Sequence, residues 1–267
     1  MNIIQALILG IVQGLTEFLP VSSSGHLVLI QNYFQEVNVG FDVIIHLATL
    51  LAIFVFFFND IIDLIKGFFT FSWKDERFRT VIYILLATLP IALIGYYLKD
   101  IIYNIFSNLY VVSLGFFISG MFLFTASFAR ELFFLEKRTT SIKKNYVSLN
   151  LKNSFVIGLV QMLALVPGIS RSGSTVSTGI LQGIDREKAI RFSFLLAIPA
   201  MIGANILNFT DLKIIELWPF ITGFVAAFIF GLLGIFIFVK YLKLKRFRYF
   251  AYYCWLLAVL TLISQVL

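Results

Sequence analysis

The 267-residue chain is 60% hydrophobic and 17% aromatic, and only 13% of its residues are charged. Its mean hydropathy of +0.95 is far above that of soluble domains, so the composition excludes an ordinary soluble fold. The net charge of +7 does not indicate nucleic acid as a partner, because Lys and Arg gather in loops beside apolar segments. Anionic membrane lipids explain that charge. We therefore predict a polytopic, all-α membrane protein, because lipid cannot form hydrogen bonds with unpaired backbone N–H and C=O groups.

Six apolar segments are long enough to cross about 30 Å of hydrocarbon as helices. Before the first of them, an apolar N-terminal segment runs into a Pro-bearing, Ser-rich break at residues 10–25, and a second break lies between the third and fourth. Residues 60–71 combine charged and aromatic side chains, which is typical of a helix at the membrane interface, although an ordinary amphipathic connector would explain them equally well. The predicted spans are residues 41–58, 81–98, 109–129, 192–209, 217–239 and 250–267.

The two breaks are copies of one unit. Residues 10–25 (GIVQGLTEFLPVSSSG) and 158–173 (GLVQMLALVPGISRSG) match at seven of sixteen positions when the numbering is shifted by 148. Each copy leads a Gln-bearing apolar segment into a Pro and a Ser/Gly turn. A cleaved signal peptide would not explain the second copy, so both units belong to the fold.

The positions of the basic loops predict how these units are oriented. Loops at residues 74–79, 130–152 and 240–248 carry an excess of Lys and Arg, which marks them as cytoplasmic. Counting spans between them makes each break a re-entrant hairpin, the first entering from outside and the second from the cytoplasm. Residues 1–267 then form a single membrane domain of two inverted repeats, 1–135 and 150–267, joined by a cytoplasmic linker at 130–152. Each repeat is one hairpin plus three transmembrane helices, and the hairpin tips are expected to meet at a polar cavity.

Ionisable side chains within the apolar segments are few, and they favour a functional site. Glu17 and His26 flank the first turn, and Arg171 lies in the second, so the three converge if the hairpins meet. Asp42 and His46 lie four residues apart on one face of the first span. His46 is explained equally well as a packing histidine or as a site residue.

The two aligned units carry different side chains at the position where a catalytic site would need two different functional groups. Ser23 falls opposite Arg171, so one copy supplies a hydroxyl and the other a guanidinium, whose planar fork suits phosphate oxygens. Backbone N–H groups of the second turn can form an anion-binding nest at a helix start. A plain N-capping loop would explain the same residues in a soluble protein, but not at membrane depth. The polar and glycine residues expected to bind substrate are Gln13, Ser22, Ser24, Gly168, Ser170, Ser172, Gly173, Ser174 and Thr175.

The first turn carries the candidate reactive groups. Ser23 is a candidate nucleophile, and Glu17 or His26 could take its proton. Glu17 could instead hold a divalent cation such as Mg²⁺, although one carboxylate with Gln13 one turn earlier is a poor protein cage. Mg²⁺ commonly completes its shell with water and substrate phosphates, so the sequence supports such a cofactor only weakly.

The two long motifs, QGLTEFLPVSSSGH at residues 13–26 and PGISRSGST at 167–175, resemble those of the bacitracin-resistance family of undecaprenyl-diphosphate phosphatases. The resemblance covers nearly the whole chain. It implies hydrolysis of the terminal phosphate of a C55 polyprenyl diphosphate, giving undecaprenyl phosphate and inorganic phosphate for the lipid carrier of peptidoglycan synthesis. It also implies a multi-pass enzyme of the bacterial inner (plasma) membrane.

Carried over by motif position, the family's catalytic set corresponds to Glu17, Ser23, His26 and Arg171, with Ser23 as nucleophile and Arg171 as phosphate clamp. The family also suggests a divalent cation. It has Glu or Gln where this chain has Gln13, so a scheme that needs two carboxylates to hold Mg²⁺ is in doubt here.

Two other functional classes share features with this sequence. The phosphatidic-acid phosphatase type 2 class, which resembles this chain in its Ser-Gly-His and Ser-Arg turns, needs a His where Ser177 stands, so it is excluded. A transporter or flippase of a phosphate-bearing polyprenyl lipid stays open, because inverted repeats with broken helices are typical of carriers. The sequence does not choose between a covalent phosphoserine and direct attack by water. It also leaves open the lipid chain length, the membrane face that admits substrate, and the oligomeric state, a homodimer included.

Overall fold

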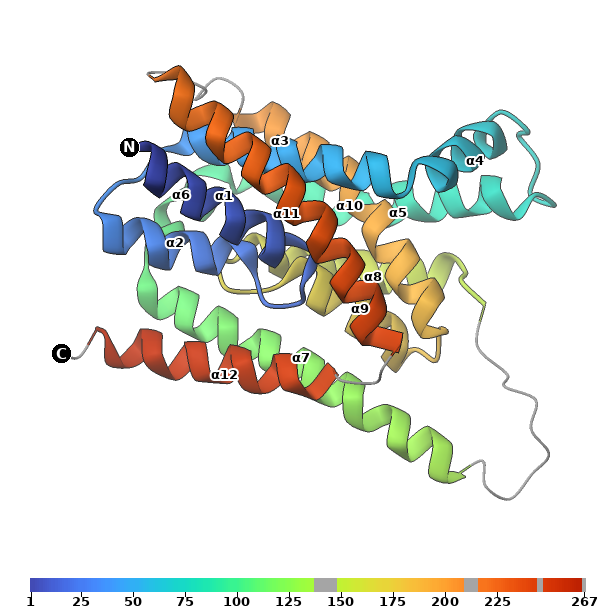
Figure 1. Cartoon of the computed structure of the whole chain (residues 1–267). Coiled ribbons are helices and arrows are strands. Elements are labelled where there is room, and N and C mark those ends of the chain that lie inside the picture. The colour runs from blue at the N-terminus through green and yellow to red at the C-terminus, as the bar shows by residue number, and fades with distance from the viewer. Residues whose placement is uncertain (137–147, 209–215, 244–246, 266–267) are drawn as a thin grey trace.

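The computed structural model describes residues 1–136, 148–208, 216–243 and 247–265, which form helices and no β-strand (Figure 1). The first half of the chain contains α1 (Ile3–Phe18), α2 (Ser23–Phe34), α3 (Val39–Phe56), α4 (Phe58–Phe68), α5 (Glu76–Tyr97), α6 (Lys99–Phe106) and α7 (Leu109–Glu136). The second half contains α8 (Leu151–Gln161), the short 3₁₀ helix η2 (Met162–Leu165), α9 (Arg171–Leu181), α10 (Arg186–Asn208), α11 (Leu217–Lys243) and α12 (Phe247–Ile263).

Five helices among the described residues are long and apolar enough to cross a membrane: α3, α5, α7, α10 and α11. They correspond to five of the six predicted spans. The sixth, predicted at residues 250–267, is the 17-residue apolar helix α12, which is shorter than a full span by this measure. Residue 209, at the end of the fourth predicted span, and residues 266–267 lie outside the described residues, as do parts of two predicted loops, residues 137–147 and 244–246.

Two further helices lie at the ends of the spans. The stretch predicted as an interfacial helix at 60–71 is α4, at Phe58–Phe68. An ion pair of 2.9 Å between Asp60 and Arg191 joins α4 to α10. The eight-residue α6 was not predicted, because it continues directly from the apolar run of α5 after Leu98.

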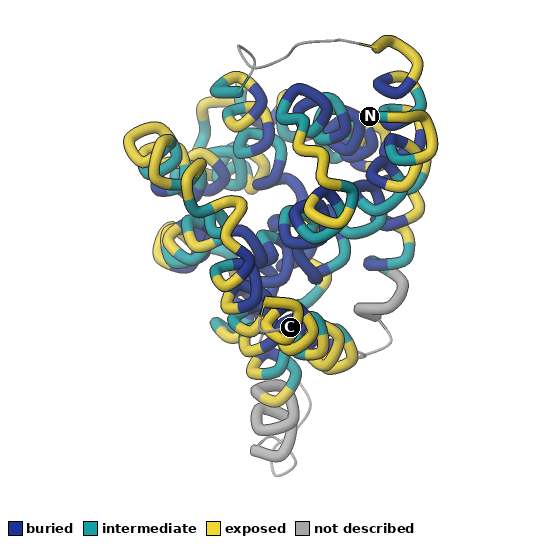
Figure 2. Tube along the Cα trace, turned by 90° about the vertical axis from the view of Figure 1, so that its left-hand side faces the viewer, coloured by how far each residue is buried: buried dark blue, intermediate teal, exposed yellow. Residues whose placement is uncertain are grey.

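The outer surface of the helix assembly is apolar. Figure 2 shows buried residues gathered in the middle and exposed residues on the outward turns of the helices. Many of the exposed residues are large and apolar, among them Leu51, Leu89, Leu114, Ile229 and Leu256. In water such a continuous apolar surface would favour aggregation, whereas hydrocarbon solvates it. The surface therefore suits a protein surrounded by lipid.

Two pairs of shorter helices are inserted among the long ones. α1 and α2 are separated by a break at residues 19–22, and α8 with η2 is separated from α9 by a break at 166–170. At about 1.5 Å per residue, the longest of these helices, α1, extends about 24 Å, which is too short to cross about 30 Å of hydrocarbon. Both breaks therefore lie where the chain turns back.

Glycines allow α1 and α8 to approach long helices closely. A Cβ added at Gly14 on α1 would lie 2.7 Å from the carbonyl oxygen of Ala227 on α11. A Cβ at Gly158 on α8 would lie 2.6 Å from Cα of Ala87 on α5. Any larger residue would therefore push these helices apart. The approach fixes the depth of each broken helix pair within the assembly.

Candidate active site

The first break is held in a strained turn. α1 ends at Phe18, Pro20 follows, and α2 begins at Ser23 after the N-capping residue Ser22. Ser22 has a φ of 66°, an uncommon value for a residue with a side chain, and conformations of this kind cost about 1–3 kcal/mol. Its hydroxyl accepts a hydrogen bond of 3.3 Å from the backbone N–H of Gly25. The turn brings Ser23 back against the last turn of α1.

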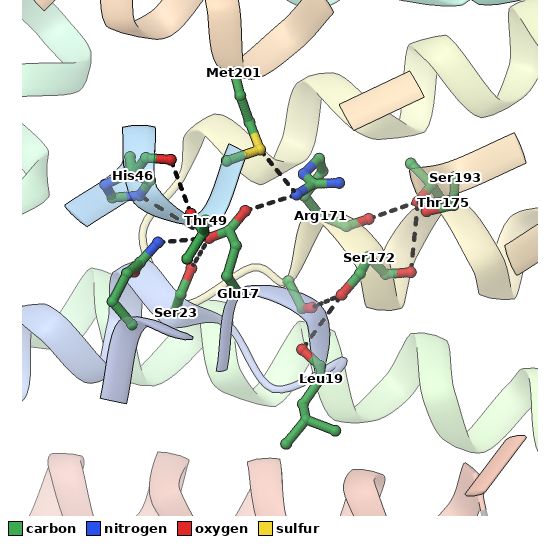
Figure 3. A network of polar contacts seen from close by, with 12 residues as sticks. Glu17, Leu19, Ser23, His46, Thr49, Arg171, Ser172, Thr175, Ser193 and Met201 are labelled. Atoms are coloured by element: carbon green, nitrogen blue, oxygen red, sulfur yellow. Dashed lines mark hydrogen bonds and ion pairs between the residues drawn. The ribbon is translucent and has the colours of Figure 1, made fainter. Parts of the chain in front are cut away.

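The carboxylate of Glu17 is the centre of the site (Figure 3). Its Oε2 accepts hydrogen bonds from Oγ of Ser23 at 2.6 Å and from Nε2 of Gln13 at 3.1 Å. Its Oε1 accepts a hydrogen bond of 2.6 Å from Nη2 of Arg171, with which it also forms an ion pair. Because Arg171 belongs to the second motif, the two breaks do meet, as the sequence predicted.

The second break is shaped by a residue from outside it. Gly168 has a φ of +91°, and a Cβ there would overlap the carbonyl oxygen of Val112 on α7. The hydroxyl of Ser119, also on α7, donates to the carbonyl of Gly168 and accepts from the backbone N–H of Ser170, both at 2.8 Å. Ser170 then caps α9 by accepting from the N–H of Gly173 at 3.0 Å. This places Arg171 at the first position of α9, facing Glu17.

The remaining hydroxyls of the second motif hold Arg171 and the two breaks in place. Ser174 and Thr175 donate to the carbonyl oxygen of Arg171 at 3.1 and 2.8 Å, and Thr175 also shares a hydrogen bond of 2.6 Å with Ser193 on α10. Ser172 donates to the carbonyl of Leu19 in the first break at 3.3 Å.

Three contacts lie within or between the turns themselves. Ser22 and Ser24 share a hydrogen bond of 3.2 Å, and Ser170 and Ser172 one of 3.3 Å. A Cβ at Gly173 would contact Pro20 at 3.3 Å. Both turns are therefore packed against each other and internally hydrogen-bonded.

His26 forms its hydrogen bonds with residues outside the expected catalytic set. Its Nδ1 lies 2.7 Å from the carbonyl oxygen of Ser22, and its Nε2 lies 2.8 Å from Oη of Tyr253 on α12. The ring stacks on Tyr253 and meets Phe116 edge-on. Within the described part of the chain, no hydrogen bond joins His26 to Ser23. Of the two bases left open by the sequence, the geometry favours Glu17 for Ser23.

His46, not His26, is the histidine beside Glu17. Its Nε2 lies 4.0 Å from Oε2 of Glu17, and its Nδ1 lies 2.7 Å from the carbonyl oxygen of Asp42 (Figure 3). The spacing of Asp42 and His46 predicted that they share one face of α3. It did not show that this face lies against α1. Tyr253 and Ser119 were not singled out, because a lone Tyr or Ser in an apolar helix is common.

Two buried polar atoms at the site have no partner in the described structure: Oε1 of Gln13 and Nη1 of Arg171. Leaving a buried polar atom unpaired costs about 1–3 kcal/mol, so such atoms are informative at a site that must accept a ligand. The free guanidinium N–H is a donor suited to a phosphate oxygen. Arg171 is therefore able to hold Glu17 and a phosphate at once.

The protein side chains do not fit a resident divalent cation. No group of three or more His, Cys, Asp or Glu side chains gathers anywhere in the described ranges. Glu17 is the carboxylate of this site, and its oxygens lie 2.6 Å from a guanidinium and from a serine hydroxyl. A guanidinium at that distance opposes a second positive charge, whereas Mg²⁺ needs several oxygen ligands.

Comparison with known proteins identifies the family. The model of the family described as Bacitracin resistance protein BacA matches residues 6–260. The chain belongs to the BacA family. This confirms the resemblance inferred from the two motifs, and with the five apolar helices it makes the chain a multi-pass membrane protein.

Several BacA-family relatives carry a named activity. The undecaprenyl-diphosphatase of Thermosipho africanus is 39% identical over 255 residues, which cover 95% of this chain and 97% of the relative. That of Methanosphaera stadtmanae is 38% identical over 285 residues, covering 100% and 99% of the two chains. That of Carboxydothermus hydrogenoformans is 39% identical over 274 residues, covering 99% and 98%.

Proposed function

We propose that the chain is an undecaprenyl-diphosphate phosphatase, which removes the terminal phosphate from a C55 polyprenyl diphosphate. The observation that carries the proposal is the arrangement around Glu17, where a serine hydroxyl and an arginine guanidinium each lie 2.6 Å from one carboxylate. A nucleophile, its base and an anion-binding group are thus assembled at one point. The relatives' names supply the substrate and the reaction.

Arg171 binds the terminal phosphate in this scheme. It stands at the first position of α9, where the helix dipole and unpaired backbone N–H groups favour an anion. Its Nη1 is unpartnered, so a phosphate oxygen can be bound there while Nη2 still holds Glu17. The guanidinium then neutralises charge on the phosphate as it is transferred.

Ser23 attacks the terminal phosphorus in the route that the geometry favours. As the Oγ–phosphorus bond forms, the bond from phosphorus to the bridging oxygen breaks, and its electron pair leaves with undecaprenyl phosphate. Oε2 of Glu17, which already accepts from the hydroxyl, takes the proton of Ser23. Once Glu17 has lost this proton, a water molecule attacks the phosphoserine and Glu17 takes the water's proton. The bond between phosphorus and Oγ breaks as the water oxygen bonds to phosphorus, inorganic phosphate is released, and Glu17 returns the proton to Oγ of Ser23. His26 supports the first turn, because its Nδ1 contacts the carbonyl oxygen of Ser22 while its Nε2 is held by Tyr253.

The proposed architecture is a pair of inverted repeats, residues 1–135 and 150–267. The packing supports it, because contacts recur in pairs when α1, α2, α3, α5 and α7 are matched with α8, α9, α10, α11 and α12. α1 packs on α11 and α8 on α5, while α3 packs on α11 and α10 on α5. The self-matched pairs α3 with α10 and α7 with α12 are also in contact. We place this domain in the bacterial inner (plasma) membrane, with the linker at 130–152 cytoplasmic.

A divalent cation would reach the site bound to the substrate. We propose that any Mg²⁺ is bound mainly by the diphosphate oxygens, because the protein site offers a single carboxylate already paired with Arg171. No step above depends on it.

The test is phosphate release from a C55 or shorter polyprenyl diphosphate by the detergent-purified protein, with Arg171→Ala as the inactive control. We expect release by the unmodified protein and a trapped phosphoenzyme that disappears in Ser23→Ala. Substantial activity in Ser23→Ala would show direct attack by water instead. No release, together with lipid flux into liposomes, would replace the phosphatase with a transporter.

A further inference from the structure

The buried base of the site has to dispose of a proton. Hydrolysis of a phosphoanhydride by water near neutral pH yields two phosphate groups and a proton. Whether Ser23 or water attacks first, Glu17 receives the proton of the attacking hydroxyl. The side chain of Glu17 is only 7% exposed, so this proton needs a route out before the carboxylate can act again.

The neighbours of Glu17 limit that route. In the described structure its polar side-chain contacts are Gln13, Ser23, Arg171 and His46. The amide of Gln13 does not take up a proton, Ser23 is the donor, and the guanidinium of Arg171 offers N–H donors and no acceptor. Among these four neighbours, His46 alone has ring nitrogens that can both accept and donate a proton.

His46 is also set up for the task by its own hydrogen bond. A carbonyl oxygen can only accept, so the contact of 2.7 Å between Nδ1 and the carbonyl of Asp42 places a proton on Nδ1. In the neutral ring, Nε2 is then the bare acceptor, and it is the atom that faces Oε2 of Glu17 at 4.0 Å. A small side-chain rotation or one bridging water closes that distance.

The exposed fractions of the three side chains support proton transfer from Glu17 toward His46. The side chain of His46 is 32% exposed, against 13% for Arg171 and 7% for Glu17. The charged groups around the imidazole are Glu17 on α1, Asp42 one turn earlier on α3, and Arg171 on α9 beyond Glu17. Gln31 on α2 holds the carboxylate of Asp42 by a hydrogen bond of 2.6 Å. The backbone carbonyl of Asp42 therefore orients the ring of His46. Its side-chain carboxylate is held by Gln31 on the same helix face as the imidazole.

We propose that His46 is a proton-relay residue that acts through Glu17. This inference rests on the proposed phosphatase function. Protonated Glu17 gives its proton to Nε2 of His46, which regenerates the carboxylate and forms an imidazolium that keeps its Nδ1 proton. The imidazolium then loses the Nε2 proton to water or to the departing phosphate and returns to its starting tautomer. In the serine route the proton of Ser23 leaves in this way, and the proton that Glu17 later takes from water returns to Oγ of Ser23. One proton is thereby passed outward in each turnover, and His46 ends unchanged.

The experiment compares His46→Gln, His46→Ala and the matched control Thr49→Val. Glutamine keeps a polar group of similar reach but does not carry a proton, and alanine leaves room for a small base. Thr49 lies on the same helix, and its hydroxyl only donates to the carbonyl of His46. Phosphate release from the polyprenyl diphosphate is measured with and without added imidazole, and thermal unfolding checks that each variant folds.

We expect about 100-fold slower turnover in both His46 variants, the lower end of the range for loss of a proton-transfer group, and activity within about twofold of the original in Thr49→Val. Imidazole should restore activity in His46→Ala and leave the rate of Thr49→Val unchanged. Full activity in His46→Gln would reduce His46 to a hydrogen-bonding residue, and a folded His46→Ala that imidazole does not restore would reduce it to a packing residue. Either result overturns the relay. Failure of the phosphatase proposal itself is distinct, because the unmodified protein would then release no phosphate.

Discussion

Nη2 of Arg171 lies 2.6 Å from Oε1 of Glu17, and this ion pair joins two helix ends that are 154 positions apart in the sequence. Glu17 is in the last turn of α1 and Arg171 is the first residue of α9. Glu17 precedes the first break and Arg171 follows the second. The pair therefore links the two breaks and pre-positions the guanidinium before substrate arrives.

Arg171→Lys should test whether the guanidinium fork is needed. Lysine can still pair with Glu17, but its single ammonium cannot hold the carboxylate and a phosphate oxygen as two arms of a plane. We expect kcat to fall by about 10²–10³, the range for losing one transition-state donor. Thermal unfolding should change little. Turnover near the original in Arg171→Lys would mean that only the charge matters.

Glu17→Gln should separate proton transfer from hydrogen bonding. The amide keeps the size of the side chain and a carbonyl oxygen for Arg171 or Ser23, but it cannot take the serine's proton. We expect kcat to drop by about 10²–10⁴, as for a lost general base. Single-turnover phosphate release measures the chemical step directly. A drop of less than about threefold would assign the base to another group.

Part of the local geometry of this site follows from the first motif. The motif at residues 13–26 places Gln13, Glu17 and Ser23 together, because helix spacing and a tight turn determine those contacts. The approach of Arg171 followed from the duplication, since matched breaks in one membrane domain must be buried against protein. Five of the six spans also followed, because length and apolarity alone define them.

The remote half of the site was not predictable from local pattern. His46 reaches Glu17 only because one face of α3 is turned toward α1. Ser119 reaches Gly168 only because α7 packs on the second break. Tyr253 meets His26 through the packing of α2 near α12. These relationships depend on tertiary packing, and each of the three side chains has an ordinary structural explanation in its own helix. The sequence also predicted that His26 would converge with Glu17. Its two ring nitrogens instead contact Ser22 and Tyr253, and the contact with Tyr253 depends on tertiary packing.

Ser119→Ala should loosen the turn that presents Arg171. The hydroxyl of Ser119 satisfies both the carbonyl of Gly168 and the N–H of Ser170, and each orphaned buried group costs about 1–3 kcal/mol. We expect lower thermal stability and lower kcat together. Ser113→Ala is the control, because it removes a buried hydroxyl of the same helix that donates to α12 instead. The control should lose stability but keep kcat; equal losses of kcat would point to a general effect of α7.

Tyr253→Phe should show whether the orientation of His26 matters. The substitution keeps the ring that stacks on His26 and removes the hydroxyl 2.8 Å from Nε2. A lost hydrogen bond is worth about 1 kcal/mol, so we expect a reduction in kcat of about fivefold. Tyr252→Phe is the matched control, since the ring of Tyr252 contacts Trp255. Equal rates for Tyr253→Phe and Tyr252→Phe would leave His26 with a packing role only.

Gln13→Glu should create a cation site with two carboxylates beside Arg171. Nε2 of Gln13 now donates to Oε2 of Glu17 at 3.1 Å, and a glutamate there would set two carboxylates against each other. Like charges at that distance destabilise the fold, and Mg²⁺, which prefers oxygen ligands, would relieve the repulsion. We therefore expect the unfolding temperature of the variant to fall without Mg²⁺ and to recover with it, while the original protein without substrate responds little. A large Mg²⁺ response in the original protein would contradict this, because it would require a cation site made by residues other than this pair.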